Sequence, residues 1–134
     1  FNTLKESLGF KFLSLQISTG NKTWFDEYAM AVVANGSVYG SAFTVAPEAN
    51  VNDGLFDIIL VKKTHIFRYF FLVPRMLNKT LHKSPLVEYF KTSEITIENK
   101  TEGYFHVDGE GYVCEKNKIH FKVDPNSLLI IHNK

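Results

Sequence analysis

The chain has 134 residues, of which 45% are hydrophobic, 22% charged and 14% aromatic. This length and composition indicate one globular domain with its own core. The chain lacks the roughly 20 consecutive apolar residues of a membrane span and the Pro/Gly/Ser-rich runs that are typical of disorder. Fifteen basic and fourteen acidic residues give a net charge of +1, which argues against nucleic acid as a partner.

The cysteine content and the start of the chain bear on its origin. A single cysteine, Cys114, allows no internal disulfide and no cysteine-rich zinc site, so we expect a reducing, cytoplasmic compartment. The chain opens with Phe1 at a segment without targeting character, which suggests a fragment or a processed product.

Most of the chain has the two-residue periodicity of β-strands, interrupted by turn residues. We expect strands over 10–17, 23–33, 40–46, 55–61, 95–97, 104–107, 118–123 and 128–132. The strand over 55–61 is almost wholly apolar, as in strands buried on both faces, so Asp57 must lie near its start or find a partner. Short strands at regular spacing with one helix predict a mainly β fold, an antiparallel β-sandwich with one covering α-helix.

The helix is expected over 64–77, with Thr64 as its N-cap and with Pro74 kinking or shortening it. Helical spacing places four apolar side chains in one stripe: Ile66, Phe70, Val73 and Leu77. Its aromatic residues allow contact with a bilayer or cover of the sheet. The segment is short and weakly basic, which favours cover of the core.

Two polar segments are candidates for a functional site. The first is the turn over 50–57, which combines two carboxylates and two amides just before the buried strand. Oxygen-rich turns of this kind bind hard cations, whereas the simpler interpretation is a hairpin in which Asp53 and Gly54 supply only turn chemistry.

The second segment is 106–112, in which Asp108 and Glu110 lie two residues apart on either side of a glycine. On extended backbone both carboxylates project to one side, where they can share proton acceptance and cation binding. A turn joining two strands explains the same residues without a function.

Five segments, in their order and spacing, resemble the C-terminal domain of the diacylglycerol kinase catalytic family, which includes bacterial lipid kinases, sphingosine kinases and ceramide kinases. The resemblance covers most of the chain. The matching segments are VANGSVYG at 33–40, FTVAPEA at 43–49, DGLFD at 53–57, LHK at 81–83 and VDGE at 107–110.

The resemblance implies the C-terminal half of a two-domain, ATP-dependent lipid kinase. The chain would be a single β-sandwich domain over 1–134 that faces an N-terminal nucleotide-binding domain, absent here, across a cleft. It would phosphorylate a diacylglycerol-like hydroxyl, with the protein cytoplasmic and peripherally attached to a membrane. A homodimer is left open.

The same resemblance implies roles for five residues. Asp108 corresponds to the base that accepts a proton from the lipid hydroxyl, and Glu110 supports it. A structural Mg²⁺ corresponds to the backbone carbonyls of Asn50 and Leu55 and to Asp53. ATP would be bound mainly by the absent domain, so the isolated chain should be inactive.

A second hypothesis needs no catalysis. The chain would be a stand-alone β-sandwich module that binds lipid or carbohydrate, and both Asp-Gly elements would act only as turns.

Overall fold

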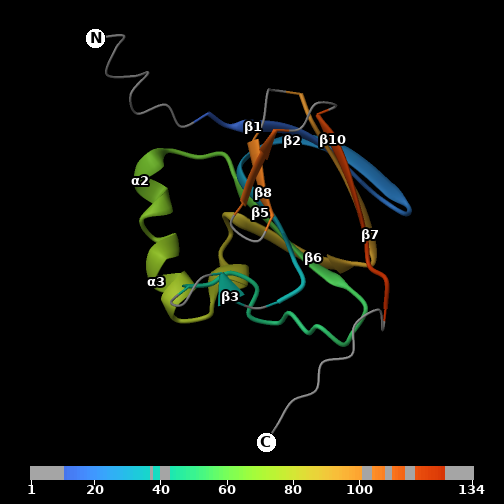
Figure 1. Ribbon diagram of the computed structural model, residues 1–134. Coiled ribbons are helices and arrows are strands. Elements are labelled where there is room, and N and C mark those ends of the chain that lie inside the picture. The colour runs from blue at the N-terminus through green and yellow to red at the C-terminus, as the bar shows by residue number, and fades with distance from the viewer. Residues whose placement is uncertain are drawn as a thin grey trace, which may run out of the picture.

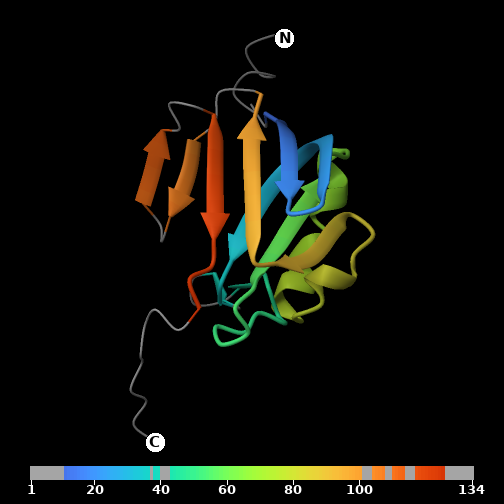
Figure 2. The same ribbon diagram turned by 90° about the vertical axis from the view of Figure 1, so that its right-hand side faces the viewer.

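A computed structural model of the chain describes residues 11–36, 38–39, 43–100, 104–107, 110–113 and 117–125. Their main feature is an antiparallel six-stranded sheet in the order β10-β7-β1-β2-β5-β6, beside the two-stranded pairs β3-β4 and β8-β9 (Figures 1 and 2). The strands are β1 (Leu13–Thr19), β2 (Lys22–Ala34), β3 (Val38–Tyr39), β4 (Phe43–Thr44), β5 (Phe56–Lys62), β6 (Val87–Thr92), β7 (Glu94–Asn99), β8 (Tyr104–Val107), β9 (Glu110–Val113) and β10 (Lys118–Lys122). The predicted mainly β fold is therefore confirmed.

The predicted strands agree with the observed ones to within a few residues, with three differences. Within the segment expected over 40–46, the described residues form only the short strand β4. β3, β6 and β9 were not predicted. The strand expected over 128–132 lies outside the described residues.

The large sheet curls so that strands far apart in its order come into contact. β5 and β10 are separated by three strands in the sheet order, yet the rings of Phe56 and Phe121 lie 6.4 Å apart, edge to face. A register shift between Tyr28 and Met30 marks a β-bulge in β2, which lies between β1 and β5 in the sheet. Because a bulge bends a strand and increases its twist, it favours this curl and the sandwich-like shape.

Each face of β5 contacts its own core cluster. The helix-side core consists of Val45, Ala46, Ile59, Val61, Leu72, Leu81 and Val87. The inner core, enclosed by the curled sheet, consists of Leu15, Ile17, Tyr28, Ile58, Leu60 and Ile95. Side chains alternate between the faces of a strand, so neighbouring residues from Ile58 to Val61 serve different cores and this stretch of β5 is wholly apolar.

The predicted helix is present as two pieces, α2 (Ile66–Tyr69) and α3 (Leu72–Leu77), and a 3-10 turn, η1 (Leu81–Lys83), follows. The break lies just before Pro74, which has no N–H to bond the carbonyl four residues earlier, as the sequence predicted. The N-cap of α2 is His65, and not Thr64 as predicted. Instead, the Thr64 N–H donates to the Tyr69 hydroxyl (2.8 Å), which donates to the Lys62 carbonyl (3.1 Å) and closes the turn.

The prediction that this helix covers the core is correct for one side only. Leu72 is buried, and Tyr69 and Met76 pack beside it against the helix-side core. The aromatic side chains on the other side are exposed, Phe67 being 75% accessible. Within the described part of the chain, no helix is long and apolar enough to cross a membrane.

The double-sided burial of β5 predicts that Ile58→Ala and Ile59→Ala each destabilise the protein. Both side chains are fully buried, in different clusters. Each truncation should lower the free energy of unfolding by about 2–5 kcal/mol, measured by denaturant titration. Val51→Ala, at a side chain that is 59% exposed, is the control and should change it by less than about 0.5 kcal/mol. A near-neutral effect at either isoleucine would show that one face of the strand carries no core.

Candidate functional site

The polar turn before β5 is held by its own side chains. The Asn50 Oδ1 accepts a hydrogen bond from the Asn52 N–H, and the Asp53 Oδ1 accepts one from the Leu55 N–H, both at 2.9 Å. These are Asx-turns, in which a side-chain oxygen replaces a backbone acceptor. Gly54 follows with φ +69°, a conformation that strains residues with a side chain. The turn chemistry that the simpler interpretation expected is therefore present.

Asp57, the second residue of β5, is fully buried. It lies two residues from Ile59 along the strand and so on the same face, at the end of the helix-side core. Its Oδ1 accepts a short hydrogen bond from the Tyr89 hydroxyl. Burial, and then the Asp57 carboxylate, raise the pKa of Tyr89, so this phenol stays protonated and donates. Both parts of the sequence expectation for Asp57, a place near the start and a partner, are confirmed.

Lys91 connects the turn to Asp57. It lies directly opposite Asp57 in the β5–β6 pairing. Its Nζ donates to the Glu48 carbonyl (2.7 Å) and to the Asp53 Oδ2 (3.0 Å), and it lies 3.5 Å from the Asp57 Oδ1. The hydrogen bond with Lys91 lowers the pKa of Asp53, and the same bond raises the pKa of Lys91. We call Glu48, Asp53, Asp57, Tyr89 and Lys91 the Lys91 cluster.

His82 of η1 lies beside the Lys91 cluster. Its ring centroid is 5.6 Å from that of Tyr89, and its Nε2 is 3.5 Å from a Glu48 carboxylate oxygen. Its Nδ1 and the Asp57 Oδ2 are buried without a hydrogen-bond partner among the described residues. Two buried polar atoms at the edge of the core therefore have no hydrogen-bond partner among the described residues.

The predicted magnesium residues Asn50, Asp53 and Leu55 lie together in this turn, and their oxygens are the hard donors that Mg²⁺ prefers. The only carboxylate in that set, on Asp53, is already paired with Lys91. The described residues contain no group of three His, Cys, Asp or Glu side chains placed to hold a metal. As they stand, these residues fit the ammonium group better than a divalent cation, which would have to displace it.

The predicted catalytic residues are placed only in part. Val107 at the end of β8 pairs with Glu110 at the start of β9, and the two strands run antiparallel. Asp108 and the side chain of Glu110 lie outside the described residues. Their roles, Asp108 as the base and Glu110 as its support, stay predictions.

The sequence analysis did not identify Tyr89 or Lys91. Both lie on β6, the strand that it missed, and Lys91 is 38 residues from Asp53. The available signal was the pair Tyr89 and Lys91 at a spacing of two, which places both side chains on one face once a strand is assumed.

Comparison with known proteins identifies the family. A family model described as the YegS C-terminal NAD kinase beta sandwich-like domain matches residues 1–132. The "Putative lipid kinase YtlR" of Bacillus subtilis (strain 168) is 33% identical over 108 residues, which are 80% of this chain and 35% of that protein. The "Probable lipid kinase YegS-like" of Shewanella frigidimarina (strain NCIMB 400) is 27% identical over 131 residues, 96% of this chain and 40% of that protein.

Solved structures agree on the fold. A protein described as a "putative diacylglycerol kinase" from Bacillus anthracis str. Sterne superposes with a TM-score of 0.65 at 22% identity, over 90% of this chain and 40% of that one. A second, described as a diacylglycerol kinase from the same organism, superposes with a TM-score of 0.57 at 21% identity, over 86% of this chain and 39% of that one. Identities this low bear on the fold alone.

This chain thus spans 35–40% of the length of the two curated relatives. The resemblance to the C-terminal part of a lipid-kinase family, first noted in the sequence motifs, is confirmed. Because the family model matches nearly the whole chain, the chain belongs to the YegS C-terminal NAD kinase beta sandwich-like domain family.

Proposed function

We propose that this chain is the C-terminal part of an ATP-dependent kinase that phosphorylates a diacylglycerol-like hydroxyl at the cytoplasmic surface of a membrane. One observation carries the proposal: two proteins named as lipid kinases align with 80% and 96% of this chain. The diacylglycerol-like substrate is the one that the resemblance in the sequence motifs implies, and chains described as diacylglycerol kinases share this fold.

The rest of the catalytic cleft belongs to an N-terminal nucleotide-binding domain in this proposal. The curated relatives are more than twice as long as the aligned segment, which leaves room for such a domain. Phosphoryl transfer depends mainly on positioning and on charge stabilisation around the phosphates. The near-neutral charge of this chain fits this proposal, in which the other domain supplies most of the positively charged groups that bind the phosphates of ATP.

The proposed chemistry assigns Asp108 as the general base and Glu110 as its support. The lipid hydroxyl oxygen attacks the γ-phosphorus while the Asp108 carboxylate takes the hydroxyl proton. The bond between the γ-phosphorus and the bridging oxygen breaks, and ADP leaves with the electron pair. The products are a phosphorylated lipid and ADP. A base of this kind contributes when it lies within hydrogen-bond reach of the hydroxyl.

Asp108→Asn tests the assignment in the full-length protein. The change removes the proton acceptor and keeps the shape, so kcat for lipid phosphorylation should fall at least about 100-fold while the melting temperature is unchanged. Asp124→Asn, at an exposed aspartate outside the proposed site, is the matched control and should retain activity. Turnover retained in Asp108→Asn would remove the base assignment.

The 134-residue chain alone should not transfer phosphate from ATP to diacylglycerol, because it lacks the proposed nucleotide-binding domain. Incubation of the purified chain with radiolabelled ATP and detergent-dispersed diacylglycerol measures this directly. Transfer at the rate of the full-length protein would rule out the division between two domains.

Magnesium held by the Asn50 and Leu55 carbonyls and by Asp53 is part of the same proposal, with Lys91 as its competitor. When bound, the ion would supply positive charge that stiffens the turn. In its absence Lys91 supplies that charge, through its contact with Asp53. The two cations therefore exclude each other at one carboxylate.

Lys91→Met tests which cation stabilises the turn. The change leaves the buried Asp57 without its cation, so the melting temperature should fall by more than in the control Lys122→Met, at an exposed lysine of β10. Added Mg²⁺ should stabilise Lys91→Met more than the wild type. Equal stabilisation of both proteins by Mg²⁺ would show that Lys91 does not occupy the cation position.

The same variant has a defined pH signature. Because Lys91 lowers the folded-state pKa of Asp53, this pairing stabilises the wild type above about pH 4 and is lost as the pH falls further. In Lys91→Met the loss of stability below about pH 4 should be smaller, as thermal melts across that range would reveal.

A further inference from the structure

The helical segment α2–α3 leaves a large apolar surface uncovered. Its aromatic face consists of six exposed side chains: Ile66, Phe67, Phe70, Phe71, Val73 and Leu77. Three of them are Phe residues with accessible fractions of 67–75%. The opposite side of the same segment packs on the core through Tyr69, Leu72 and Met76. A helical segment that is apolar on both sides, with one side in solvent, marks an interaction surface.

The stretch of chain that carries the aromatic face is rich in positive charge, most of it without a carboxylate partner among the described residues. From Lys62 to Lys83 the chain has six lysines and arginines and no aspartate or glutamate. Lys62 and Lys63 pair with carboxylates of neighbouring strands. No carboxylate among the described residues pairs with the other four, which are Arg68, Arg75, Lys79 and Lys83. In a chain with a net charge of +1, four cations of this one segment are thus without a carboxylate partner among the described residues.

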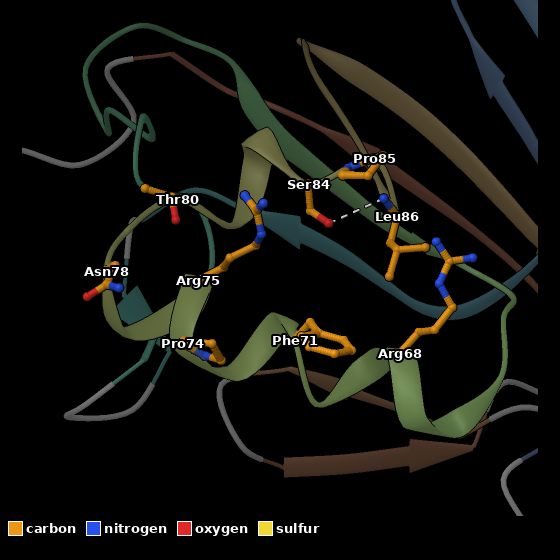
Figure 3. A pocket seen from close by; sticks show the side chains of 9 residues that line it. All are labelled: Arg68, Phe71, Pro74, Arg75, Asn78, Thr80, Ser84, Pro85 and Leu86. Atoms are coloured by element: carbon orange, nitrogen blue, oxygen red, sulfur yellow. Dashed lines mark hydrogen bonds between the residues drawn. The ribbon is translucent and has the colours of Figure 1, made fainter.

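Two of these cations line a groove of about 620 Å³ between the helices and the segment 84–86, which precedes β6. In Figure 3 the guanidinium groups of Arg68 and Arg75 lie on either side of it, and the Phe71 ring lies between the two arginines. The opposite wall is formed by the segment 84–86, where the Ser84 Oγ accepts the Leu86 N–H (3.3 Å). Each guanidinium group can bind phosphate oxygens through two parallel hydrogen bonds.

We propose that the aromatic face and the Arg68–Arg75 groove together dock the protein on an anionic bilayer surface. The phenyl rings would enter the boundary between headgroups and acyl chains, and the arginines would contact lipid phosphates. A protein partner would have to bring one carboxylate for each buried cation, whereas an anionic bilayer presents phosphates over the whole area. The docking surface rests on the proposed function, which requires the enzyme to reach a lipid in a membrane.

Vesicle co-sedimentation of the full-length protein, without ATP, tests the surface. The probes are phosphatidylcholine vesicles with and without phosphatidylglycerol. Wild-type protein should bind the anionic vesicles more tightly, and salt should weaken that binding. Arg68→Gln with Arg75→Gln should weaken it about 25-fold, since each arginine near the surface contributes about fivefold. Phe67→Ala with Phe70→Ala should weaken binding to both vesicle types by roughly tenfold or more.

The control is Lys118→Gln with Lys122→Gln, which removes the same charge from β10 at the opposite edge of the sheet. This control should bind vesicles within about twofold of the wild type, apart from the long-range effect of charge. If the control and the arginine variant lost the same amount of vesicle binding, the effect would come from net charge alone, and the proposed docking surface would be overturned. All variants change exposed or half-exposed side chains, so circular dichroism should show native melting.

Unchanged vesicle binding in both surface variants would also overturn the proposal. If hydrogen exchange then showed the helices 66–77 protected in the full-length protein, the occupant would be another part of the protein or a second copy. Vesicle binding involves no phosphoryl transfer, so its failure overturns the docking surface alone. Absence of lipid phosphorylation by the wild type overturns the proposed function alone.

Discussion

The buried carboxylate of Asp57 is the constraint on which the polar part of the structure depends. An ionised carboxylate in the interior is tolerated only with hydrogen-bond and charge partners. Asp57 takes both from β6, through the Tyr89 hydroxyl and the Lys91 ammonium. Lys91 also binds Asp53. The partners of the Asp57 carboxylate therefore connect β5, β6 and the turn that precedes β5.

The apolar part of the structure is organised by the same strand. β5 contributes Ile58 and Leu60 to the inner core and Ile59 and Val61 to the helix-side core. Sheet curl encloses the first cluster, while α3 and η1 cover the second. The Lys91 cluster lies at the end of the helix-side core, so the polar turn is positioned by packing on both sides.

The helical segment meets a different demand on each side. The inward residues Tyr69, Leu72 and Met76 complete the core. The outward aromatic face has no partner within the described chain, and the unpaired arginines accompany it. The same segment can thus stabilise the fold and offer a surface, because a helix presents different residues at different angles.

Local patterns in the sequence were sufficient for several features. Alternating polarity predicted most strands, the apolar run over 55–61 predicted double-sided burial, and Pro74 predicted the helix break. The Asn50 and Asp53 turns also followed from short-range chemistry, because each side chain bonds an N–H two residues on. Such features depend only on a few neighbouring residues, so the local sequence is sufficient to predict them.

Other features were decided only by the tertiary structure. β6 escaped prediction because VEYFKT places Glu88 and Lys91 among apolar residues, and their charges are satisfied only by partners far along the chain. The preference for a core-covering helix was half correct, because periodicity shows an apolar stripe but not which side the sheet will bury. By itself the sequence determined most of the strands, the Asx-turns before β5 and the family resemblance. Packing alone decided that Lys91 pairs with Asp53 and Asp57 and that three phenylalanines face solvent, since both depend on contacts between distant segments.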